Sequence, residues 1–471
     1  MFVAFAVDRA LGILLIVLIT RWWAPVEVGY WTQAITLTGA LGTIASMGLY
    51  QAHIRFAEES AEPRIRHSLQ LTILSATTGA LLLAATVAAV IPGAFSRTVF
   101  GVATETRLLA AVFALAMSEL WAEFVTVQLR AEVDARGAAL VLAGKAVLRV
   151  LLISTLAVSG GGDVARAVSA LALAQWLAAV VVIVARLGGL HWLSAGFAPA
   201  RELFRRSVKM ALPMIPAALA AQGFVTTERF VLARTSPEVI AHFNIGQQFA
   251  SNAMMAYVIL GSMFYPMLVR VWREGKAVAA APVVSGALLT YAVVSLPALL
   301  VLPLVSRELV PFLTTRFYEV SASSFFLLMI GAAGLGVHQL AGYVFYVTER
   351  TWELLTLLAL ALGLKLALAI ILVERCGERG AVFAWGIAGA VLAIATVLRA
   401  RHFVRFDLPV ARLARIAGSA LVAAAVVVAV RILTTDPSRT LVLGSGVVAL
   451  AGYALLMRNE LRQAAHVGTA P

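Results

Sequence analysis

Solid blocks of apolar residues, each about 20 residues long, alternate with short polar segments along the chain. An α-helix rises about 1.5 Å per residue, so one such block crosses a hydrocarbon core of about 30 Å. A membrane β-barrel would instead alternate apolar and polar residues along each strand. The pattern therefore predicts an all-α polytopic membrane protein with about fourteen transmembrane helices. The predicted spans are 2–20, 29–53, 68–92, 106–129, 138–158, 167–187, 208–233, 240–269, 280–305, 320–345, 354–374, 381–401, 415–433 and 441–457.

Composition agrees with the pattern. Only 13% of the 471 residues are charged and 61% are hydrophobic, whereas soluble domains carry about 25% charge. A formal net charge of +13 would suggest nucleic-acid binding in a soluble protein. In a membrane protein it is explained by basic loops kept on the cytoplasmic side, and we expect no nucleic-acid partner.

The distribution of Lys and Arg predicts the orientation. With the N-terminus inside, 21 basic residues fall on the cytoplasmic side and 12 on the outer side. This bias predicts that both termini are cytoplasmic. Asp8-Arg9 interrupts the first apolar block, and Trp22-Trp23-Ala24-Pro25 is a poor cleavage site, which favours a first transmembrane helix over a signal peptide. The helix starts almost at Met1, so the natural start could lie upstream.

A polar stretch occurs twice. Residues 20–34 read TRWWAPVEVGYWTQA, and residues 233–248 read ARTSPEVIAHFNIGQQ. Each copy follows the first span of a six-span set, so we expect one six-helix unit used twice. Six is even, so the two units run in the same direction, as a parallel repeat with a pseudo-twofold axis along the membrane normal. Four segments are predicted: an N-terminal lobe 1–187, a cytoplasmic basic linker 188–207, a C-terminal lobe 208–405, and two additional helices with a tail, 406–471.

No enzyme motif is found in the sequence. Gly144-Lys145-Ala146 and Gly275-Lys276-Ala277 lack the other residues of a phosphate-binding loop. The seven histidines do not cluster at metal-ligand spacings, and Cys376 is the only cysteine. We therefore expect no catalytic residues, no metal and no cofactor.

Charges at membrane depth are the candidate functional residues, because they are costly unless they face a cavity or a partner. Glu119 and Glu123 share one helix face, as do Lys145 and Arg149 on the next span. An antiparallel hairpin brings them to matching depth and predicts two rungs, Glu119–Arg149 and Glu123–Lys145. Two interpretations stay open: an ion-pair clamp between helices, or a charged wall of a translocation cavity.

Further candidates lie on other spans. Lys365 is near the middle of its span, where a basic residue should meet water, an acid or an anionic substrate. Asp8 and Arg9 point about 100° apart on the first helix, so Arg9 is either a substrate contact or a helix-end anchor. Pro213 and Pro216 break the helical hydrogen bonding of span 7 and form a possible bend. Glu228-Arg229, near the outer end of that span, is predicted to be interfacial, like Trp22 and Trp23.

The stretches LITRWWAPVEVGYWTQAITL and LFRRSVKMALPMIPAALAAQGFVTTERFVLARTSPEVIAHFNIGQQFA resemble one family. This is the polysaccharide-biosynthesis membrane proteins, oligosaccharide flippases of the multidrug/oligosaccharidyl-lipid/polysaccharide exporter superfamily. The match covers the N-terminal third of each half and the 12-plus-2 plan. The second copy has Ala241-His242-Phe243 where the family has Gly-Ile-Tyr, so no substrate residue is carried across.

The resemblance implies a flippase in the bacterial cytoplasmic membrane that moves an undecaprenyl-diphosphate-linked glycan by alternating access. Its partners would be the bilayer and, in the cell, a polysaccharide polymerase and glycosyltransferases. Arg9, Lys145, Arg149 and Lys365 supply charge that complements an anionic diphosphate. Three alternatives stay open: a cation-coupled multidrug exporter of the same superfamily, a peptidoglycan-precursor flippase, and, less favoured because no outer loop is long, a membrane glycosyltransferase or polymerase.

Overall fold

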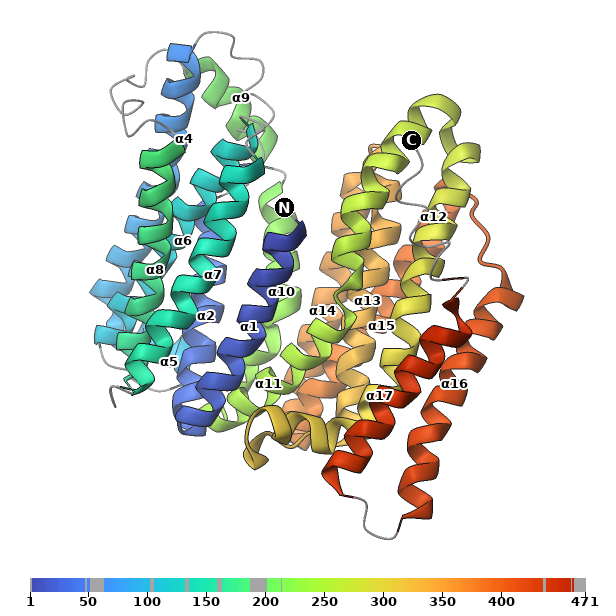
Figure 1. Cartoon of the computed structure of the whole chain (residues 1–471). Helices are drawn as coiled ribbons and strands as arrows, with labels where there is room; N and C mark the ends of the chain where they lie inside the picture. Colours follow the sequence, from blue (N-terminus) through green and yellow to red (C-terminus); the bar gives the residue numbers. More distant parts are fainter. Residues whose placement is uncertain are drawn as a thin grey trace. The chain divides into compact units, whose positions relative to one another are not determined.

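A computed structural model describes most of the chain (Figure 1). The described residues are 2–46, 49–50, 63–101, 106–131, 135–158, 163–186, 201–212, 214–434, 438–458 and 460. Within these ranges the regular structure is entirely helical, with no strand. The predicted all-α class is confirmed.

The chain folds into two compact units, Met1–Ala241 and His242–Pro471. The boundary falls inside one helix, so the first unit includes the helix that the sequence pattern placed at the start of the C-terminal lobe. The predicted linker falls largely on residues 187–200, which lie outside the described ranges. The arrangement as two six-helix lobes stays a prediction.

In the first unit, a central α6 packs against α8, α2 and α7, and α1 packs along α7. One buried cluster of this unit includes Val125 and Leu129 of α6, Val141 of α7 and Val182 of α8. Its helices are α1 Phe2–Trp22, α2 Pro25–Ser46, α4 Pro63–Val90, α5 Pro92–Phe100, α6 Thr106–Ala131, α7 Ala135–Val158, α8 Val164–Arg186, α9 Arg201–Ala211 and α10 Met214–Leu232.

In the second unit, α13 packs between α12 and α15, and α14 packs on α15. Helix α11, Pro237–Met254, crosses the boundary between the units. The remaining elements are α12 Ala256–Leu313, the 3-10 turn η3 Arg316–Tyr318, α13 Ala322–Val347, α14 Thr351–Cys376, α15 Glu378–Phe403, α16 Val410–Leu433 and α17 Arg439–Leu456.

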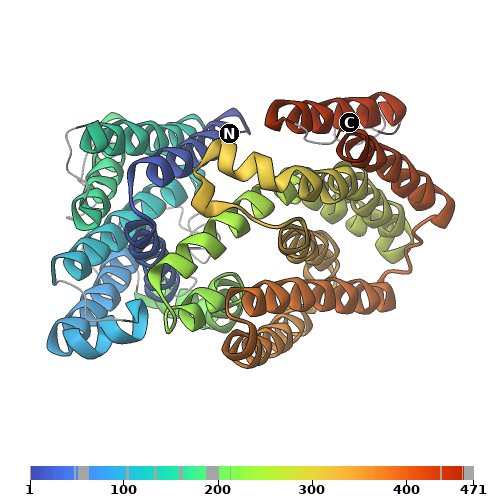
Figure 2. The ribbon, with the colours of Figure 1, turned by 90° about the horizontal axis from the view of Figure 1, so that it is seen from below.

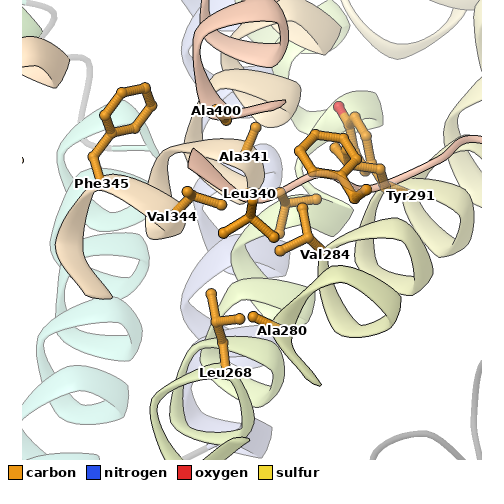
Figure 3. Close-up of a cluster of buried hydrophobic side chains, with 12 residues drawn as sticks. Leu268, Ala280, Val284, Tyr291, Leu340, Ala341, Val344, Phe345 and Ala400 are labelled. Atoms are coloured by element: carbon orange, nitrogen blue, oxygen red, sulfur yellow. The ribbon is translucent and has the colours of Figure 1, made fainter. Parts of the chain in front are cut away.

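Helix α12 is 58 residues long and bends back on itself (Figure 1). Leu268 of its first arm and Ala280 and Val284 of its second arm belong to one buried cluster with Leu340 and Val344 of α13 (Figure 3). Predicted span 240–269 is divided between α11 and the first arm of α12, and predicted span 280–305 lies within the second arm. The helix contains five prolines, each of which removes a backbone hydrogen bond and favours bending: Pro266, Pro282, Pro297, Pro303 and Pro311.

Helices α16 and α17 form a pair that packs on α12 at the edge of the second unit (Figure 2). A separate buried cluster joins Val301 and Val305 of α12 to Val427 of α16 and Val442 of α17. The hydroxyl of Tyr453 donates to the Val293 carbonyl at 2.8 Å. The two predicted C-terminal helices are therefore docked on the unit by their own core.

Glycines set the close approach of α13 and α15. A Cβ on Gly334 would lie 2.2 Å from the Gly389 carbonyl oxygen, and one on Gly389 would lie 2.6 Å from the Gly331 Cα. Small residues let transmembrane helices pack backbone to backbone. This crossing forms the centre of the second unit.

Ten helices of the described chain are long and apolar enough to cross a membrane, and the count reaches eleven if α11 and the first arm of α12 form one bent span. The chain is thus a multi-pass membrane protein, while the figure of fourteen spans is not reached by this count. Helix α2 is not among the counted helices, because buried polar residues such as Gln33, Thr36 and Thr38 lower its hydropathy.

Candidate functional site

The repeated polar stretch begins a helix in both copies. Helix α1 ends at Trp22 and α2 starts at Pro25, with Glu27 in its first turn accepting a hydrogen bond from the Ala24 amide at 2.9 Å. Helix α11 likewise starts at Pro237, with Glu238 in its first turn. Proline suits the first helical position and an acidic residue suits the positive end of the helix dipole. The shared letters therefore specify a helix start.

The tryptophans of the first copy have different surroundings. Trp22 is 43% exposed, as an interfacial anchor would be, whereas Trp23 is only 8% exposed. The Trp23 ring packs edge-on against Trp31, with 5.4 Å between the ring centroids. The prediction of an interfacial role was wrong for Trp23, because the turn folds its ring back onto α2.

The two copies of the stretch meet inside the first unit. A Cβ on Gly29 would lie 2.1 Å from the Pro237 carbonyl oxygen, so the start of α11 rests directly on the first turns of α2. Next to this contact, Gly101 adopts φ +76°, and its Cα lies against the Ala233 carbonyl. Only glycine accommodates both the left-handed backbone and the close approach at that position.

Buried polar groups reinforce this contact. The Gln33 amide donates to the Val99 carbonyl at 2.9 Å and to the Arg229 carbonyl at 3.0 Å. The Arg229 guanidinium donates to the Thr36 hydroxyl at 2.8 Å, and Glu228 is fully buried. The structure shows that Arg229 contacts α2, and the interfacial position of Glu228-Arg229 stays a prediction. The only feature of the sequence that indicated this contact was the position of Glu228-Arg229 just before the second copy of the polar stretch.

A charged cluster in the first unit contains most of the predicted site residues. Asp8 of α1 and Arg149 of α7 form an ion pair with 2.5 Å between Oδ1 and Nη2. Both side chains are largely buried, and the Nε of Arg149 is buried without a hydrogen-bond partner in the described structure. Glu119 of α6 interacts electrostatically with Arg149 and also with Lys145.

The cluster differs in detail from the predicted ladder. The ion-pair partner of Arg149 is Asp8, not Glu119, because α1 packs along α7 and carries Asp8 to the guanidinium. Glu119 is half-buried within the group, whereas Glu123 is exposed. Arg9, next to Asp8, is exposed. Four helix-borne charges, from three helices, are therefore brought together: Asp8, Glu119, Lys145 and Arg149.

Lys365 has a separate environment in the second unit. Its side chain is fully buried, and its ammonium nitrogen lies 4.5 Å from the centroid of the Trp385 ring. The indole of Trp385 in turn donates to the Leu328 carbonyl at 2.8 Å. A desolvated cation over an aromatic face is stabilised by about 2 kcal/mol. This contact joins α14, α15 and α13.

The predicted bend lies between α9 and α10. Helix α9 ends at Ala211 and α10 begins at Met214. Pro213 lies outside the described residues, and Pro216 is exposed in the first turn of α10, where proline is tolerated. A functional bend at this place stays a prediction.

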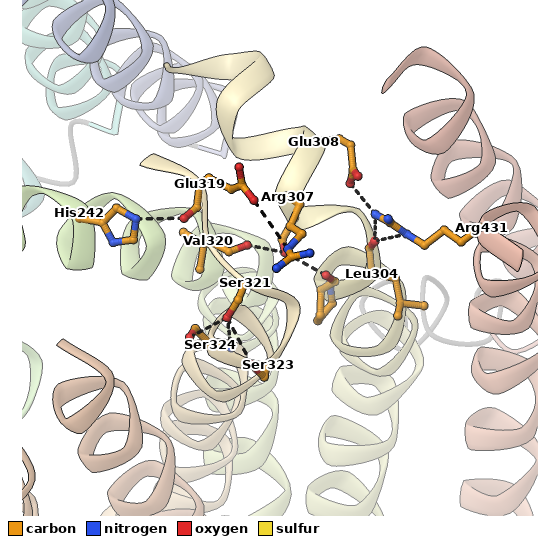
Figure 4. A network of polar contacts seen from close by, with 12 residues as sticks. His242, Leu304, Arg307, Glu308, Glu319, Val320, Ser321, Ser323, Ser324 and Arg431 are labelled. Carbon is orange, nitrogen blue, oxygen red and sulfur yellow. Dashed lines mark hydrogen bonds and ion pairs between the residues drawn. The ribbon is translucent and has the colours of Figure 1, made fainter. Parts of the chain in front are cut away.

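A polar network closes one end of the second unit (Figure 4). The imidazole of His242 contacts the Glu378 carboxylate at 2.6 Å and donates to the Glu319 carbonyl at 3.0 Å. Nearby, Arg431 of α16 pairs with Glu308 of α12 at 2.6 Å. The sequence marked His242 only as a departure from the family pattern, and its partners are more than 70 residues away. In the described ranges, no group of His, Cys, Asp and Glu is arranged to hold a metal ion.

Comparison with known proteins identifies the family. The model of the family described as polysaccharide biosynthesis protein matches residues 2–272. The chain belongs to this family. No match was found among the curated proteins compared with it.

Solved structures with the same fold are membrane transporters. The lipid II flippase MurJ in an inward closed conformation is similar with a TM-score of 0.76 and 13% identity, covering 98% of this chain and 99% of that one. An inward-facing multidrug resistance MATE family transporter of the MOP superfamily has a TM-score of 0.64 and 16% identity, covering 86% of this chain and 98% of that one. A mutant of the Vibrio cholerae MATE transporter VcmN has a TM-score of 0.59 and 16% identity, covering 85% and 94% of the two chains. At these identities the similarity concerns the fold alone. The chain therefore has the same fold as these transporters.

Proposed function

We propose that the protein is a flippase that moves a lipid-diphosphate-linked oligosaccharide, a precursor of a cell-surface polysaccharide, across the cytoplasmic membrane. The observation that carries this proposal is the polysaccharide-biosynthesis family match over residues 2–272 in a chain with the fold of a lipid flippase. The substrate class follows from the family, because a polysaccharide precursor built on a lipid must change membrane face before it is polymerised. Alternating access of two six-helix lobes, 1–187 and 208–405, with a C-terminal pair in 406–471, is the mechanism proposed.

The charged cluster supplies the chemistry for the diphosphate. Arg149 is held by Asp8 but keeps its Nε unpaired, and Lys145 lies in the same electrostatic environment. Arg9 is exposed beside them. Guanidinium and ammonium groups form short charge-assisted hydrogen bonds with phosphate oxygens. We assign these three residues to binding of the diphosphate. Lys365 is fully buried beside Trp385, and we assign it to a part of the binding site that becomes accessible only when the second unit rearranges.

A peptidoglycan-precursor flippase is the second candidate, favoured by the fold match to the lipid II flippase over 98% of this chain. A cation-coupled multidrug exporter is supported by the MATE structures, which cover 86% or less of it in the examples above. The proposed orientation places both termini in the cytoplasm, and the proposed partners are glycosyltransferases and a polymerase that handle the same lipid-linked glycan.

Deletion of the gene, with analysis of lipid-linked glycans on each membrane face, tests the proposal. We expect the glycan to accumulate on the cytoplasmic face, and the wild-type gene, but not Arg149→Ala, to restore export. Unchanged glycan export with reduced dye efflux would instead indicate a drug exporter. Accumulation of peptidoglycan precursor alone would select the second candidate.

A further inference from the structure

Three tyrosines form an aromatic cluster on the second unit, outside the charged residues discussed above. Tyr265 lies on the first arm of α12, and Tyr343 and Tyr346 lie near the end of α13. The ring centroids of Tyr265 and Tyr343 are 4.8 Å apart, and those of Tyr265 and Tyr346 are 6.1 Å apart. The ring centroids of Tyr343 and Tyr346 are 6.3 Å apart, so each ring contacts the other two.

This cluster has a buried base and an open face. Tyr343 packs against the buried cluster that includes Leu340 and Val344 of α13. Tyr265 is 37% exposed and Tyr346 is 48% exposed. The exposed Gln339, one turn before Tyr343, points its amide toward the Tyr343 hydroxyl at 3.5 Å. The rings and two kinds of hydrogen-bonding group thus share one surface.

The backbone makes room for the cluster. A Cβ on Gly261 of α12 would lie 2.3 Å from the Tyr343 hydroxyl oxygen. Gly261 is therefore the residue that lets this hydroxyl lie between α12 and α13. An aromatic belt at the membrane interface needs only single rings directed toward the headgroups. Mutual packing and a glycine recess indicate a more specific surface.

The chemistry of the surface fits a neutral sugar. Tyrosine rings offer apolar faces for the C–H faces of a sugar ring, and their hydroxyls, with the Gln339 amide, offer donors and acceptors for sugar hydroxyls. The four side chains carry no charge. Two arginines of the same unit, Arg350 and Arg399, are both paired with Glu353, at 3.3 Å and 2.5 Å. None of the four side chains therefore provides a positive charge for an anionic diphosphate.

We infer that Tyr265, Tyr343, Tyr346 and Gln339 form a sugar-binding platform that contacts the glycan of the transported lipid. The inference rests on the proposed function, which supplies a glycan as part of the substrate. It adds a division of labour: basic residues recognise the diphosphate, and this uncharged platform recognises the sugar. The platform thereby makes binding depend on the glycan as well as on its lipid carrier.

The test measures two affinities of the purified full-length protein in lipid nanodiscs. The probes are a polyprenyl diphosphate without sugar and the same lipid carrying the polysaccharide repeat unit of the source strain. For the wild type we expect the sugar to improve Kd about tenfold, which corresponds to about 1.4 kcal/mol. In Tyr265→Leu/Tyr346→Leu this gain should largely disappear, while the Kd of the bare lipid stays unchanged.

Controls separate the platform from other effects. Trp352→Leu removes a 63% exposed aromatic ring from α14 of the same unit and should leave both affinities unchanged. Gly261→Ala should displace Tyr343 and reduce the sugar gain without removing any ring. If the double variant does not fold, Tyr346→Leu alone provides the comparison, because Tyr346 is the most exposed of the three.

The possible failures are distinguishable. A sugar gain that is absent in the wild type, or unchanged in the variants, overturns the platform and leaves the proposed function standing. An equal loss of affinity for both lipids also overturns it, and indicates a general lipid contact instead. A wild-type protein that binds neither lipid contradicts the proposed function itself.

Discussion

At the scale of single residues, Asp8 and Arg149 form the central contact of the first unit's charged cluster. The pair joins α1 to α7 with 2.5 Å between the charged groups, and both side chains are largely buried. Breaking one partner of a buried pair leaves a charge without compensation, which is far more costly than losing an exposed pair. Arg149 therefore has an observed role, holding α1, and a proposed role, offering a cation to a substrate.

Charge exchange separates these two roles. We expect Asp8→Ala to lower stability by about 1–3 kcal/mol, the cost of leaving a buried polar group unpaired. Asp8→Arg combined with Arg149→Asp should recover most of that loss, measured by thermal unfolding in detergent. Glycan export should stay low in the double variant, because the position proposed to face the diphosphate is then acidic. A double variant no more stable than the single ones would contradict direct pairing.

Sequence reasoning at this scale found the charges but not their partners. The four-residue spacings of Glu119–Glu123 and Lys145–Arg149 predicted two rungs, whereas Arg149 pairs with Asp8 and Glu123 is exposed. The Asp8 partner was missed because it depends on α1 packing along α7, which no local pattern encodes. Lys365 was predicted to be at membrane depth, but its contact with Trp385 requires the α14–α15 packing.

At the scale of elements, the two copies of the polar stretch act as helix starts that touch. Pro25 and Pro237 each open a helix, and Gly29 allows the second start to rest on the first helix. Gln33 and Arg229 extend the contact with hydrogen bonds. The repetition in the sequence thus marks a contact between helices from the two predicted halves of the chain.

The glycine in this contact gives a direct test. Gly29→Ala places a methyl group 2.1 Å from the Pro237 carbonyl, a backbone atom that cannot simply rotate away. We expect the free energy of unfolding to fall by about 1–3 kcal/mol, as for other overpacking changes. The matched control is Gly42→Ala in the same helix, which meets nothing within 4 Å and should be neutral or slightly stabilising. Equal unfolding temperatures for the two variants would show that the close contact is unimportant.

At the scale of the whole molecule, the count of basic residues predicts the orientation. Cys376 is the only cysteine of the chain and is exposed at the end of α14. With both termini in the cytoplasm and the fourteen predicted spans, this residue is predicted to face outward. Labelling of this natural thiol therefore reports the orientation, and no cysteine-free protein has to be engineered.

Labelling of intact cells tests the orientation. A membrane-impermeant maleimide should modify Cys376 of the expressed protein before the cells are permeabilised. Cys376→Ser provides the control and should remain unlabelled. Labelling that occurs only after permeabilisation would place this end of α14 in the cytoplasm and reverse the predicted topology.

The sequence by itself determined the class of molecule, its all-helical character and the family, because membrane thickness and backbone hydrogen bonding leave few choices for apolar runs of this length. It also located the charged residues, whose cost in a membrane makes them conspicuous. Only the tertiary structure decided which of them pair. Asp8 meets Arg149, Gly29 meets Pro237 and Tyr265 meets Tyr343 across 141, 208 and 78 residues of chain respectively. Such contacts depend on how helices rotate and pack, and apolar periodicity in an all-round hydrophobic helix carries little information about that rotation.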